Sequence, residues 1–278
     1  MIVSLIQEKQ NALYQFETEN VFFYKAQVVE YQKDMIQQNL LLMEEAARQG
    51  TDLIVSSEAI NYPGQPDKVE GDYLDYIPTL DDELFVRLGM IAKMGNCYLA
   101  AGVYRKEWKE NSWQAFNSVV FYDRSGKICE IYDKTHLVGD ENLYLTKGNQ
   151  YKVVETDFGK IGFAICWDMQ FPETAWTLTD MGADMVIVPT WGWEWIYGPC
   201  RAYENGIYVA AAMAVPYYMP IEGLRSPSEV ISPEGTIIMR GSLQEAGIIS
   251  CEISDIRNHM EKRDLRKSCR RQHLSELC

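Results

Sequence analysis

The sequence lacks the residues and motifs on which several large enzyme classes depend. Its 278 residues include only three histidines, and none lies within five residues of another histidine or of a cysteine pair. A zinc site is therefore not expected, and we predict no metal and no other cofactor. The patterns of a P-loop (GxxxxGK[ST]), a dinucleotide-binding loop (GxGxxG), a serine nucleophile elbow (GxSxG) and a zinc protease (HExxH) are all absent.

Signals for disulfides, secretion and membrane insertion are missing as well. The seven cysteines are odd in number and form no CxxC pair, which is typical of reduced thiols in the cytoplasm. The N-terminus has neither a basic segment nor a long apolar core, so no signal peptide is expected. The longest apolar run, residues 207–215, is far shorter than the roughly 20 residues that span a membrane. We therefore expect a cytoplasmic protein that does not contact membranes.

Basic residues are scarce over most of the chain. Lys and Arg number 26 against 40 Asp and Glu, which gives a net charge of −14. This balance argues against nucleic-acid binding, which requires a basic surface. The exception is residues 255–278, where basic side chains outnumber acidic ones. We interpret this stretch as a C-terminal tail, either a solvated helix or a strand-pairing segment, on a single domain that spans residues 1–278.

Short strand-like runs alternate with helical segments along the chain. Strands are expected at residues 2–6, 53–56, 98–104, 116–122, 128–132, 151–156, 160–165, 185–188, 207–212, 229–231, 237–239 and 248–252. Helices are expected at residues 34–48, 79–94 and 172–181. Many short strands with few helices favour an α/β fold of two mixed sheets covered by helices over a single Rossmann sheet.

Three segments place a reactive side chain just after an apolar strand. Residues 53–60 (LIVSSEAI) carry Glu58, residues 132–137 (YDKTHL) carry Lys134, and residues 159–173 (GKIGFAICWDMQFPE) carry Cys166. Such positions open into the crevice where α/β proteins usually bind their ligands. Taken singly, each residue also fits an ordinary role as a surface carboxylate, a solvated lysine or a small buried thiol.

Together these three side chains could hydrolyse an amide without histidine. Cys166 would be the nucleophile, and Lys134 would lower the pKa of its thiol and stabilise the oxyanion. Glu58 would take the thiol proton, pass it to the leaving amine and then activate water, because an apolar enclosure raises the pKa of a carboxylate toward neutrality. The backbone N–H of Trp167 is the expected second oxyanion donor.

The order and the flanking residues of these segments resemble the nitrilase, or carbon–nitrogen hydrolase, superfamily. Its motifs are Pro-Glu after a strand, Arg-Lys-x-His-Leu, and Cys-[Tyr/Trp]-Asp-x-x-[Phe/Tyr]-Pro-Glu; this chain has SE at 57–58, DKTHL at 133–137 and CWDMQFPE at 166–173. Similar words continue with GADMVIVP at 182–189, RAYEN at 201–205 and SPSEVISPEG at 226–235. The resemblance implies a four-layer α-β-β-α sandwich that forms a homodimer or a higher homo-oligomer.

The superfamily also has a second functional glutamate between the lysine and the cysteine, usually seven residues before a glycine. Glu141 lies seven residues before Gly148 and is the residue to which this role maps. The resemblance implies that it holds the lysine and helps to position the substrate. Asp140 is the alternative if the loop register differs by one residue.

Four residues depart from the common pattern of the superfamily, and one of them, Arg225, lies in the approach to the hairpin where small residues are commoner. Ser57 replaces the proline before the glutamate, and Asp133 replaces the arginine before the lysine, where it adds a carboxylate near Lys134 unless it points away. Gln170 stands where many members carry arginine, which argues against an omega-amidase-like site.

The residues after the nucleophile also bear on the substrate. True nitrilases of the superfamily usually read CWEN, whereas this chain reads CWD and is similar to the branch that includes N-carbamoylputrescine amidases. We therefore expect a small-molecule amide or N-carbamoyl substrate, hydrolysed through a thioester acyl-enzyme with release of ammonia or an amine. Nitrile hydrolysis, acyl transfer and a non-catalytic assembly role on the same scaffold are the alternatives.

Aromatic residues are expected to form part of the substrate pocket. Tyr62, Trp191 and Glu194 are the predicted binding residues, and Glu194 would suit an amine-bearing substrate. Whether Trp193 and Trp195 line the pocket or an interface between subunits is left open by the sequence.

Overall fold

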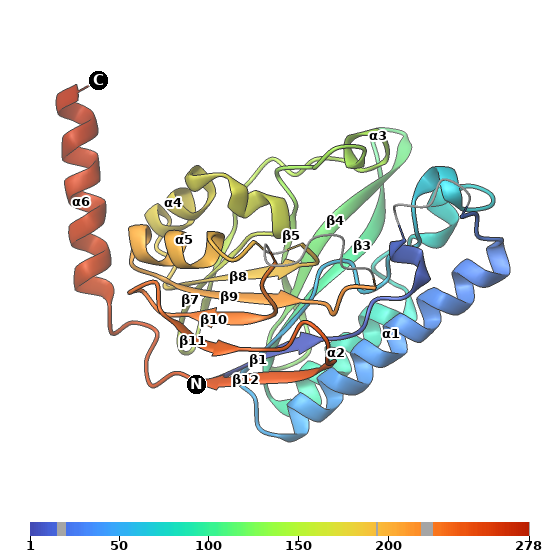
Figure 1. The fold of residues 1–278 in the computed structure, drawn as a ribbon, viewed down its shortest axis with the longest axis horizontal. Helices are drawn as coiled ribbons and strands as arrows, with labels where there is room; N and C mark the ends of the chain where they lie inside the picture. The colour runs from blue at the N-terminus through green and yellow to red at the C-terminus, as the bar shows by residue number, and fades with distance from the viewer. Residues whose placement is uncertain (16–20, 193, 218–224, 278) are drawn as a thin grey trace.

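The computed structural model describes residues 1–15, 21–192, 194–217 and 225–277, which contain two six-stranded sheets (Figure 1). The first sheet has the strand order β12-β1-β2-β3-β4-β5. Its strands are β1 (Ile2–Gln7), β2 (Leu53–Ser56), β3 (Tyr98–Lys109), β4 (Ser112–Tyr122), β5 (Ile128–Asp133) and β12 (Gly247–Glu252). The second sheet has the order β11-β10-β9-β8-β7-β6, with β6 (Val153–Thr156), β7 (Gly159–Phe163), β8 (Met185–Thr190), β9 (Tyr208–Met213), β10 (Glu229–Ile231) and β11 (Ile237–Arg240).

Both sheets are mixed, as the sequence predicted. Parallel pairs form the centre, namely β1 with β2, β2 with β3, β7 with β8, and β8 with β9, while the outer pairs are antiparallel. The carboxyl ends of parallel strands meet at one edge of a sheet, so residues that follow β2, β7 and β8 can converge on a common site.

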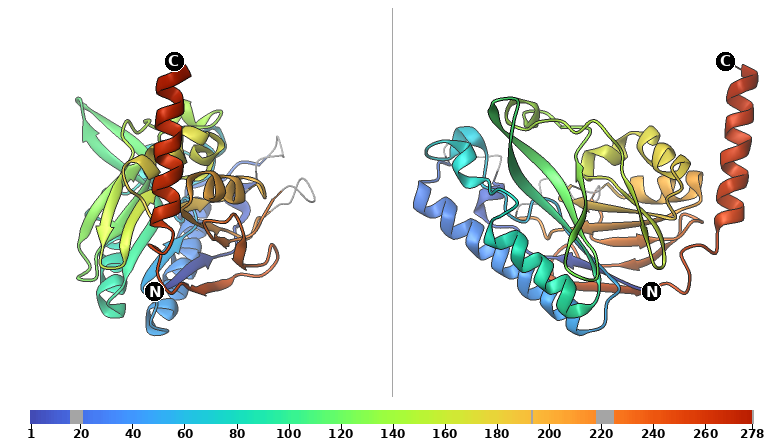
Figure 2. Two further views of the ribbon diagram at one scale, coloured as in Figure 1. Left: turned by 90° about the vertical axis from the view of Figure 1, so that its left-hand side faces the viewer. Right: turned by 180° about the vertical axis from the view of Figure 1, so that it is seen from behind.

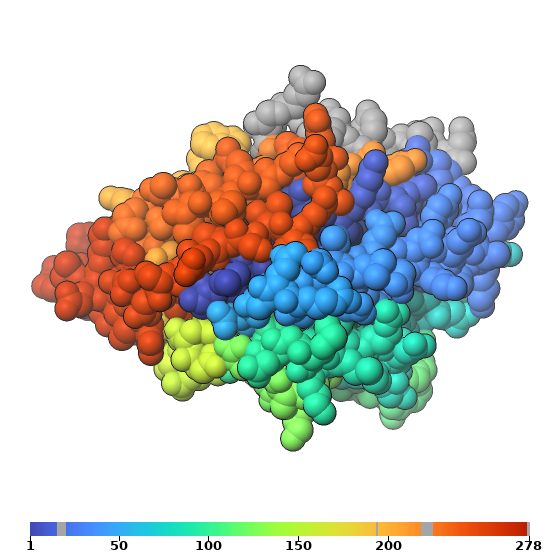
Figure 3. All heavy atoms as spheres, turned by 90° about the horizontal axis from the view of Figure 1, so that it is seen from below, coloured from blue at the N-terminus to red at the C-terminus, as the bar shows by residue number. Residues whose placement is uncertain are grey.

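Helices cover the outer face of each sheet and complete the four layers. Helices α1 (Lys25–Arg48) and α2 (Glu83–Gly95) lie side by side on the first sheet, as the space-filling view from below shows (Figure 3). Helices α4 (Pro172–Asp180) and α5 (Tyr197–Asn205) pack on the second sheet. Between the sheets lies a core of apolar side chains from both, including Val3, Val55, Phe163 and Ile187. The expected α-β-β-α sandwich is therefore confirmed.

Several elements are longer than expected. Helix α1 begins at Lys25 rather than at residue 34, because its first turns carry too few apolar residues to show helical periodicity. Strands β3 and β4 extend into a long hairpin whose turn residues, Glu110 and Asn111, have φ of 53° and 63°. Helix α5 was not expected at all, since its RAYEN sequence is mostly polar.

The basic C-terminal segment forms helix α6 (Met260–Leu277), so the helical alternative holds and the strand-pairing one is wrong. Figures 1 and 2 show it at one edge of the molecule beside α4 and α5, with its C-terminal end pointing away. Long basic side chains connect it to this layer: Arg263 pairs with Asp184, Lys267 Nζ donates to the carbonyl of Asp180 at 2.7 Å, and the Arg270 guanidinium lies 5.0 Å from the ring centroid of Trp176.

Candidate active site

Cys166 lies at a strained turn between a buried strand and a short helix. It follows β7 and opens the 3₁₀ helix η4 (Cys166–Gln170), and its φ is 43°, in the left-handed region that non-glycine residues rarely adopt. Such strain persists only where the surroundings enforce it, and it is concentrated at functional sites. The turn lifts the thiol out of the strand and leaves Cys166 only partly buried.

The carboxylate of Asp168 holds this turn against the loop that carries the lysine. One oxygen accepts from Tyr132 Oη and from the N–H of Ile165, both at 2.8 Å. The other accepts from Thr135 Oγ1 and the N–H of His136, both at 2.9 Å. The bonds from Tyr132, Thr135 and His136 connect the end of β5 to the start of η4, and the bond from Ile165 closes the η4 turn itself. They therefore fix Cys166 relative to the loop that follows Lys134.

Lys134, Glu58 and Glu141 form a buried ionic cluster. The Nζ of Lys134 lies 2.9 Å from Oε1 of Glu58 and 3.0 Å from each carboxylate oxygen of Glu141, and all three side chains are buried. Glu141 opens the short helix α3 (Glu141–Tyr144), whereas the neighbouring Asp140 is exposed. The register that the sequence favoured is thus the one that brings a carboxylate to the lysine. Asp133 points away, with both carboxylate oxygens on the guanidinium of Arg105 at 2.8 and 2.9 Å.

A third strand contributes Asn117, whose Nδ2 donates to Oε1 of Glu58 at 2.7 Å. Oε1 is therefore fully engaged, while Oε2 accepts no hydrogen bond from any described residue. Gly102 on β3 allows this arrangement, because a Cβ there would collide with the carbonyl of Ser57 and with the side chain of Pro189 on the other sheet. The free oxygen of Glu58 is thus available to accept or give a proton.

The electrostatics of the cluster follow from burial and opposed charges. Burial raises the pKa of Glu58, and the opposing charge of Lys134 does not cancel this effect. Burial alone would lower the pKa of Lys134, but the carboxylates of Glu58 and Glu141 raise it well above its ordinary value, so this lysine stays cationic. The cluster can therefore hold one permanent positive charge beside an exchangeable proton.

The thiol of Cys166 interacts electrostatically with Glu58, Lys134 and Glu141, which places it beside the cluster. Burial raises its pKa to about 12, the charge of Glu58 adds to this effect, and Lys134 and the hydroxyl of Thr190 oppose it. The predicted effect of Lys134, to lower the pKa of the Cys166 thiol, is present, but desolvation outweighs it. The sulfur holds its proton until a base removes it.

The N–H of Trp167 is available as the expected oxyanion donor. It lies in the first turn of η4, where backbone N–H groups have no intrahelical acceptor. It donates to no residue that the structure describes. An oxygen bound near the sulfur could therefore accept from this N–H and from the ammonium of Lys134.

Two of the three predicted pocket residues come together in an aromatic cluster. Tyr62 is buried, and its ring centroid lies 6.4 Å from that of Trp191. Tyr14, from the 3₁₀ helix η1 (Ala12–Tyr14), lies 4.6 Å from Tyr62 and 5.6 Å from Trp191 between ring centroids. Tyr14 Oη also donates to the carbonyl of Ala59, directly after Glu58, at 2.8 Å. The aromatic cluster therefore adjoins the turn that carries Glu58.

The other aromatic and acidic candidates lie farther out. Glu194 is exposed and pairs through its backbone with Arg225. Its carboxylate raises the pKa of Tyr197, which burial and Glu194 together move to about 12. Trp195 is exposed, and Trp193 lies outside the described residues.

Sequence reasoning missed Asn117, Asp168 and Tyr14. Asn117 carried a usable signal, because it is a polar residue inside the apolar run of β4. Asp168 stood in the quoted CWD motif, but only the fold shows that it accepts bonds from the lysine loop. Tyr14 had no local signal, since its role depends on contacts with residues more than 40 positions away.

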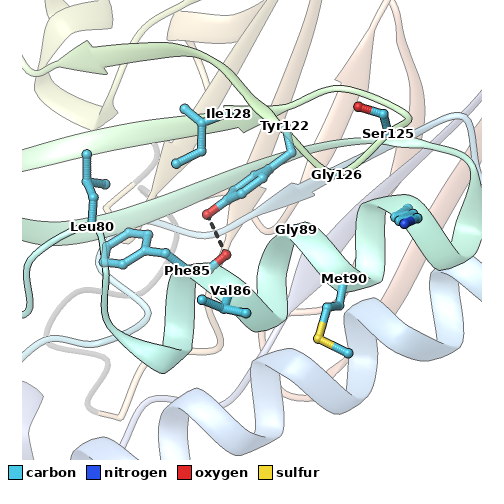
Figure 4. Close-up of a pocket in the computed structure, with 10 residues that line it drawn as sticks. Leu80, Phe85, Val86, Gly89, Met90, Tyr122, Ser125, Gly126 and Ile128 are labelled. Atoms are coloured by element: carbon cyan, nitrogen blue, oxygen red, sulfur yellow. Dashed lines mark hydrogen bonds between the residues drawn. The ribbon is translucent and has the colours of Figure 1, made fainter.

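A separate surface pocket of about 320 Å³ lies between α2 and the turn that joins β4 to β5 (Figure 4). Its lining includes Phe85, Met90 and Ile128, and Tyr122 Oη donates to the carbonyl of Phe85 at 3.0 Å. None of the candidate catalytic residues lines it. In the described ranges, no helix is long and apolar enough to cross a membrane, and no cluster of His, Cys, Asp and Glu could hold a metal ion.

Comparison with known proteins identifies the class to which this fold and site belong. The profile of the carbon–nitrogen hydrolase family matches residues 12–258, and the chain therefore belongs to this family. A probable nitrilase from Schizosaccharomyces pombe, C965.09, is 31% identical over 173 residues. That match covers 60% of this chain and 62% of the relative, so the chain spans less than two thirds of that protein.

Two further proteins extend the comparison. Omega-amidase NIT2-B from Xenopus laevis is 28% identical over 229 residues, which cover 76% of this chain and 80% of that protein. A solved structure of an amidase from Nesterenkonia sp. AN1, a mutant with acrylamide added at its active-site cysteine, matches with a TM-score of 0.71. It is 20% identical, and the match covers 95% of this chain and 99% of that one.

Proposed function

We propose that this protein hydrolyses a non-peptide C–N bond, in an amide or N-carbamoyl compound, through a thioester on Cys166. The observation that carries the proposal is the buried pair of Glu58 and Lys134, 2.9 Å apart, beside the thiol of Cys166. A nucleophile, a base and an oxyanion donor close together are the groups that acyl transfer requires. Burying these charged groups costs desolvation free energy, which fits a site kept for its chemistry rather than for stability.

The first half of the reaction forms the acyl-enzyme. Oε2 of Glu58 takes the proton from the sulfur as the sulfur attacks the carbonyl carbon, so no free thiolate is needed beforehand. The oxyanion that develops accepts from Lys134 Nζ and from the N–H of Trp167. Glu58 then gives its proton to the leaving nitrogen, the C–N bond breaks, and ammonia or an amine departs.

The second half regenerates the enzyme. Glu58 removes a proton from a water molecule, whose oxygen attacks the thioester carbonyl. The C–S bond breaks, Glu58 returns the proton to the sulfur, and the carboxylic or carbamic acid leaves. Glu141 keeps Lys134 aimed at the oxyanion throughout, since its two oxygens both bind the ammonium.

The proposed preference for amides over nitriles is supported by the activities named for similar proteins and by residues of this chain. The similar proteins include an omega-amidase and an amidase that reacts at its active-site cysteine. In this chain Asp168 follows Trp167, and its two oxygens are engaged by Tyr132, Thr135, His136 and the N–H of Ile165, which suits a positioning group. A small-molecule substrate is expected to contact the aromatic cluster of Tyr62 and Trp191, and we propose that the protein works as a homo-oligomer in the cytoplasm.

Ammonia release from a panel of amides, N-carbamoyl compounds and nitriles tests the proposal. We expect turnover of at least one amide or carbamoyl compound, and a loss of at least about 10³-fold in Cys166→Ala. Cys129→Ala, which changes an exposed thiol on β5, is the matched control and should retain full activity. Intact-mass measurement should detect the acyl group on wild-type enzyme. Full turnover by Cys166→Ala would exclude this cysteine as the nucleophile.

A further inference from the structure

Glu8 is a buried acid that the proposed mechanism does not use. It follows β1 directly, is fully buried, and lies beside the end of β2, with which β1 pairs in parallel. In the described part of the chain no lysine, arginine or histidine forms an ion pair with it, and its Oε2 accepts no hydrogen bond. A buried carboxylate without a cation costs free energy of folding, so its presence calls for a function.

The short hydrogen bond of the Glu8 carboxylate connects it to the turn that carries Glu58. Ser57 Oγ donates to Oε1 of Glu8 at 2.6 Å, which is in the range of charge-assisted O–H···O bonds. Ser57 is itself fully buried and directly precedes Glu58. The bond therefore connects the end of β1 to the residue next to the proposed base.

The turn depends on such anchors because its backbone is unusual. Ala59, on the other side of Glu58, has a φ of 54° in the left-handed region. Its carbonyl accepts from Tyr14 Oη at 2.8 Å, and the N–H of Ile60 donates to the carbonyl of Gly102 at 2.9 Å. These contacts hold the turn after Glu58. Before Glu58, Ser56 Oγ donates to the carbonyl of Ser57 at 2.8 Å, and the side chain of Ser57 donates to Glu8 and to no other group of the described residues.

We propose that Glu8 is a positioning residue, whose carboxylate anchors Ser57 and thereby holds Glu58 in the geometry that lets it take the proton of Cys166. The inference rests on the proposed function, in which Glu58 is the base. A shift of the base by a fraction of an ångström slows proton transfer without altering how the substrate binds. Glu8 should therefore affect kcat more than KM.

The surroundings of Glu8 make this anchor sensitive to protonation. Burial raises the pKa of Glu8 to about 7, against smaller opposing effects of Ser57 and of the Asn39 amide on α1. Tyr14 from η1 faces it as well, because the charges of Glu8 and Glu58 both raise the pKa of that phenol. From the described residues just after β9 (214–217), the N–H of Val215 donates to the backbone carbonyl of Glu8. The ionised carboxylate accepts the stronger bond from Ser57.

Three variants test this role. Ser57→Ala removes the donor, and Glu8→Gln keeps an acceptor of the same shape but removes the charge. Ser4→Ala is the matched control. Ser4 is a buried serine on β1, the strand that Glu8 follows, and its hydroxyl bonds to Thr51 and Ser250 at 2.7 and 2.8 Å, away from the site. The readouts are kcat and KM on the best amide, the melting temperature, and the rate at which iodoacetamide alkylates Cys166, followed by mass spectrometry from pH 5.5 to 8.5.

We expect Ser57→Ala to lower both kcat and the alkylation rate about tenfold, with KM within about twofold. Glu8→Gln should lower both rates about threefold and remove an inflection near pH 7 from the alkylation profile. The double variant should match Ser57→Ala, since one bond cannot be lost twice. Ser4→Ala should stay within about twofold of wild type in both rates.

Unchanged rates in Ser57→Ala, or an equal loss in Ser4→Ala, would overturn the proposal. Alkylation needs no substrate, so these outcomes can be read even if no amide in the panel is hydrolysed. A missing turnover by wild type counts against the proposed function, whereas full turnover by well-folded Ser57→Ala and Glu8→Gln counts against Glu8 alone.

Discussion

Lys134 Nζ lies 2.9 Å from Oε1 of Glu58, and both side chains are buried. The pair joins the end of β2 to the loop after β5, which are 76 residues apart in the chain. The charges of the cluster do not cancel, because Glu141 adds a second carboxylate to the single ammonium of Lys134. The surplus negative charge keeps the lysine protonated and helps to raise the pKa of Glu58. A permanently cationic lysine and a protonatable carboxylate thus arise from one cluster.

The two adjacent acids of the lysine loop should behave differently. Glu141→Gln removes the carboxylate that binds Lys134 through both oxygens, so we expect kcat to fall about 10²-fold. Asp140→Asn changes an exposed neighbour and should leave kcat within about twofold. Steady-state ammonia release compares the two variants. A larger loss in Asp140→Asn would place the functional acid one residue earlier.

Asn117 should set the pH range of the reaction. Its amide donates to Glu58 and so favours the ionised carboxylate, which means that Asn117→Leu raises the pKa of Glu58 further. The base is then protonated over a wider range, and the acidic limb of the kcat/KM profile should move to higher pH by about one unit. A profile recorded from pH 5 to 9 gives the shift. A limb that stays in place or moves to lower pH would contradict the assignment of Glu58 as the base.

The aromatic cluster should govern binding more than chemistry. Trp191→Ala removes a ring that packs against Tyr14 and Tyr62 next to the catalytic turn, so we expect KM to rise about tenfold with a smaller change in kcat. Trp108→Ala, at an exposed ring on β3, is the control for loss of an indole and should change neither constant. If both constants are unchanged in Trp191→Ala, the substrate does not use this wall.

Glu8 should make the protein less stable as the pH rises. Its native pKa of about 7 exceeds the ordinary value of 4.5, so between these pH values the native state binds more protons than the unfolded state. The free energy of unfolding therefore falls across this window, by a total on the order of 3 kcal/mol, and the loss is complete above pH 7. Glu8→Gln cannot ionise. The free energy of unfolding of this variant, relative to that of wild type, should therefore be higher at pH 8 than at pH 5. Urea unfolding at both pH values measures this difference. An equal difference at both values would show that Glu8 does not titrate in this window.

Much of the site follows from local sequence. The ends of β2 and β7 were predictable because short apolar runs are followed by Glu58 and Cys166, and the family resemblance added Lys134 and the register of Glu141. The two-sheet architecture also followed, since many short strands with few helices leave little choice of packing. These are properties of neighbouring residues, which a linear pattern records.

The ionisation of the site was decided by the tertiary structure alone. Lys134 was expected to lower the pKa of the Cys166 thiol, and it does act in that direction, but burial has the larger effect and raises this pKa to about 12. Burial likewise raises the pKa of Glu8, the residue after the first strand, whose carboxylate accepts from Ser57. Desolvation depends on every atom that packs around a group, and those atoms come from segments whose proximity no local pattern encodes.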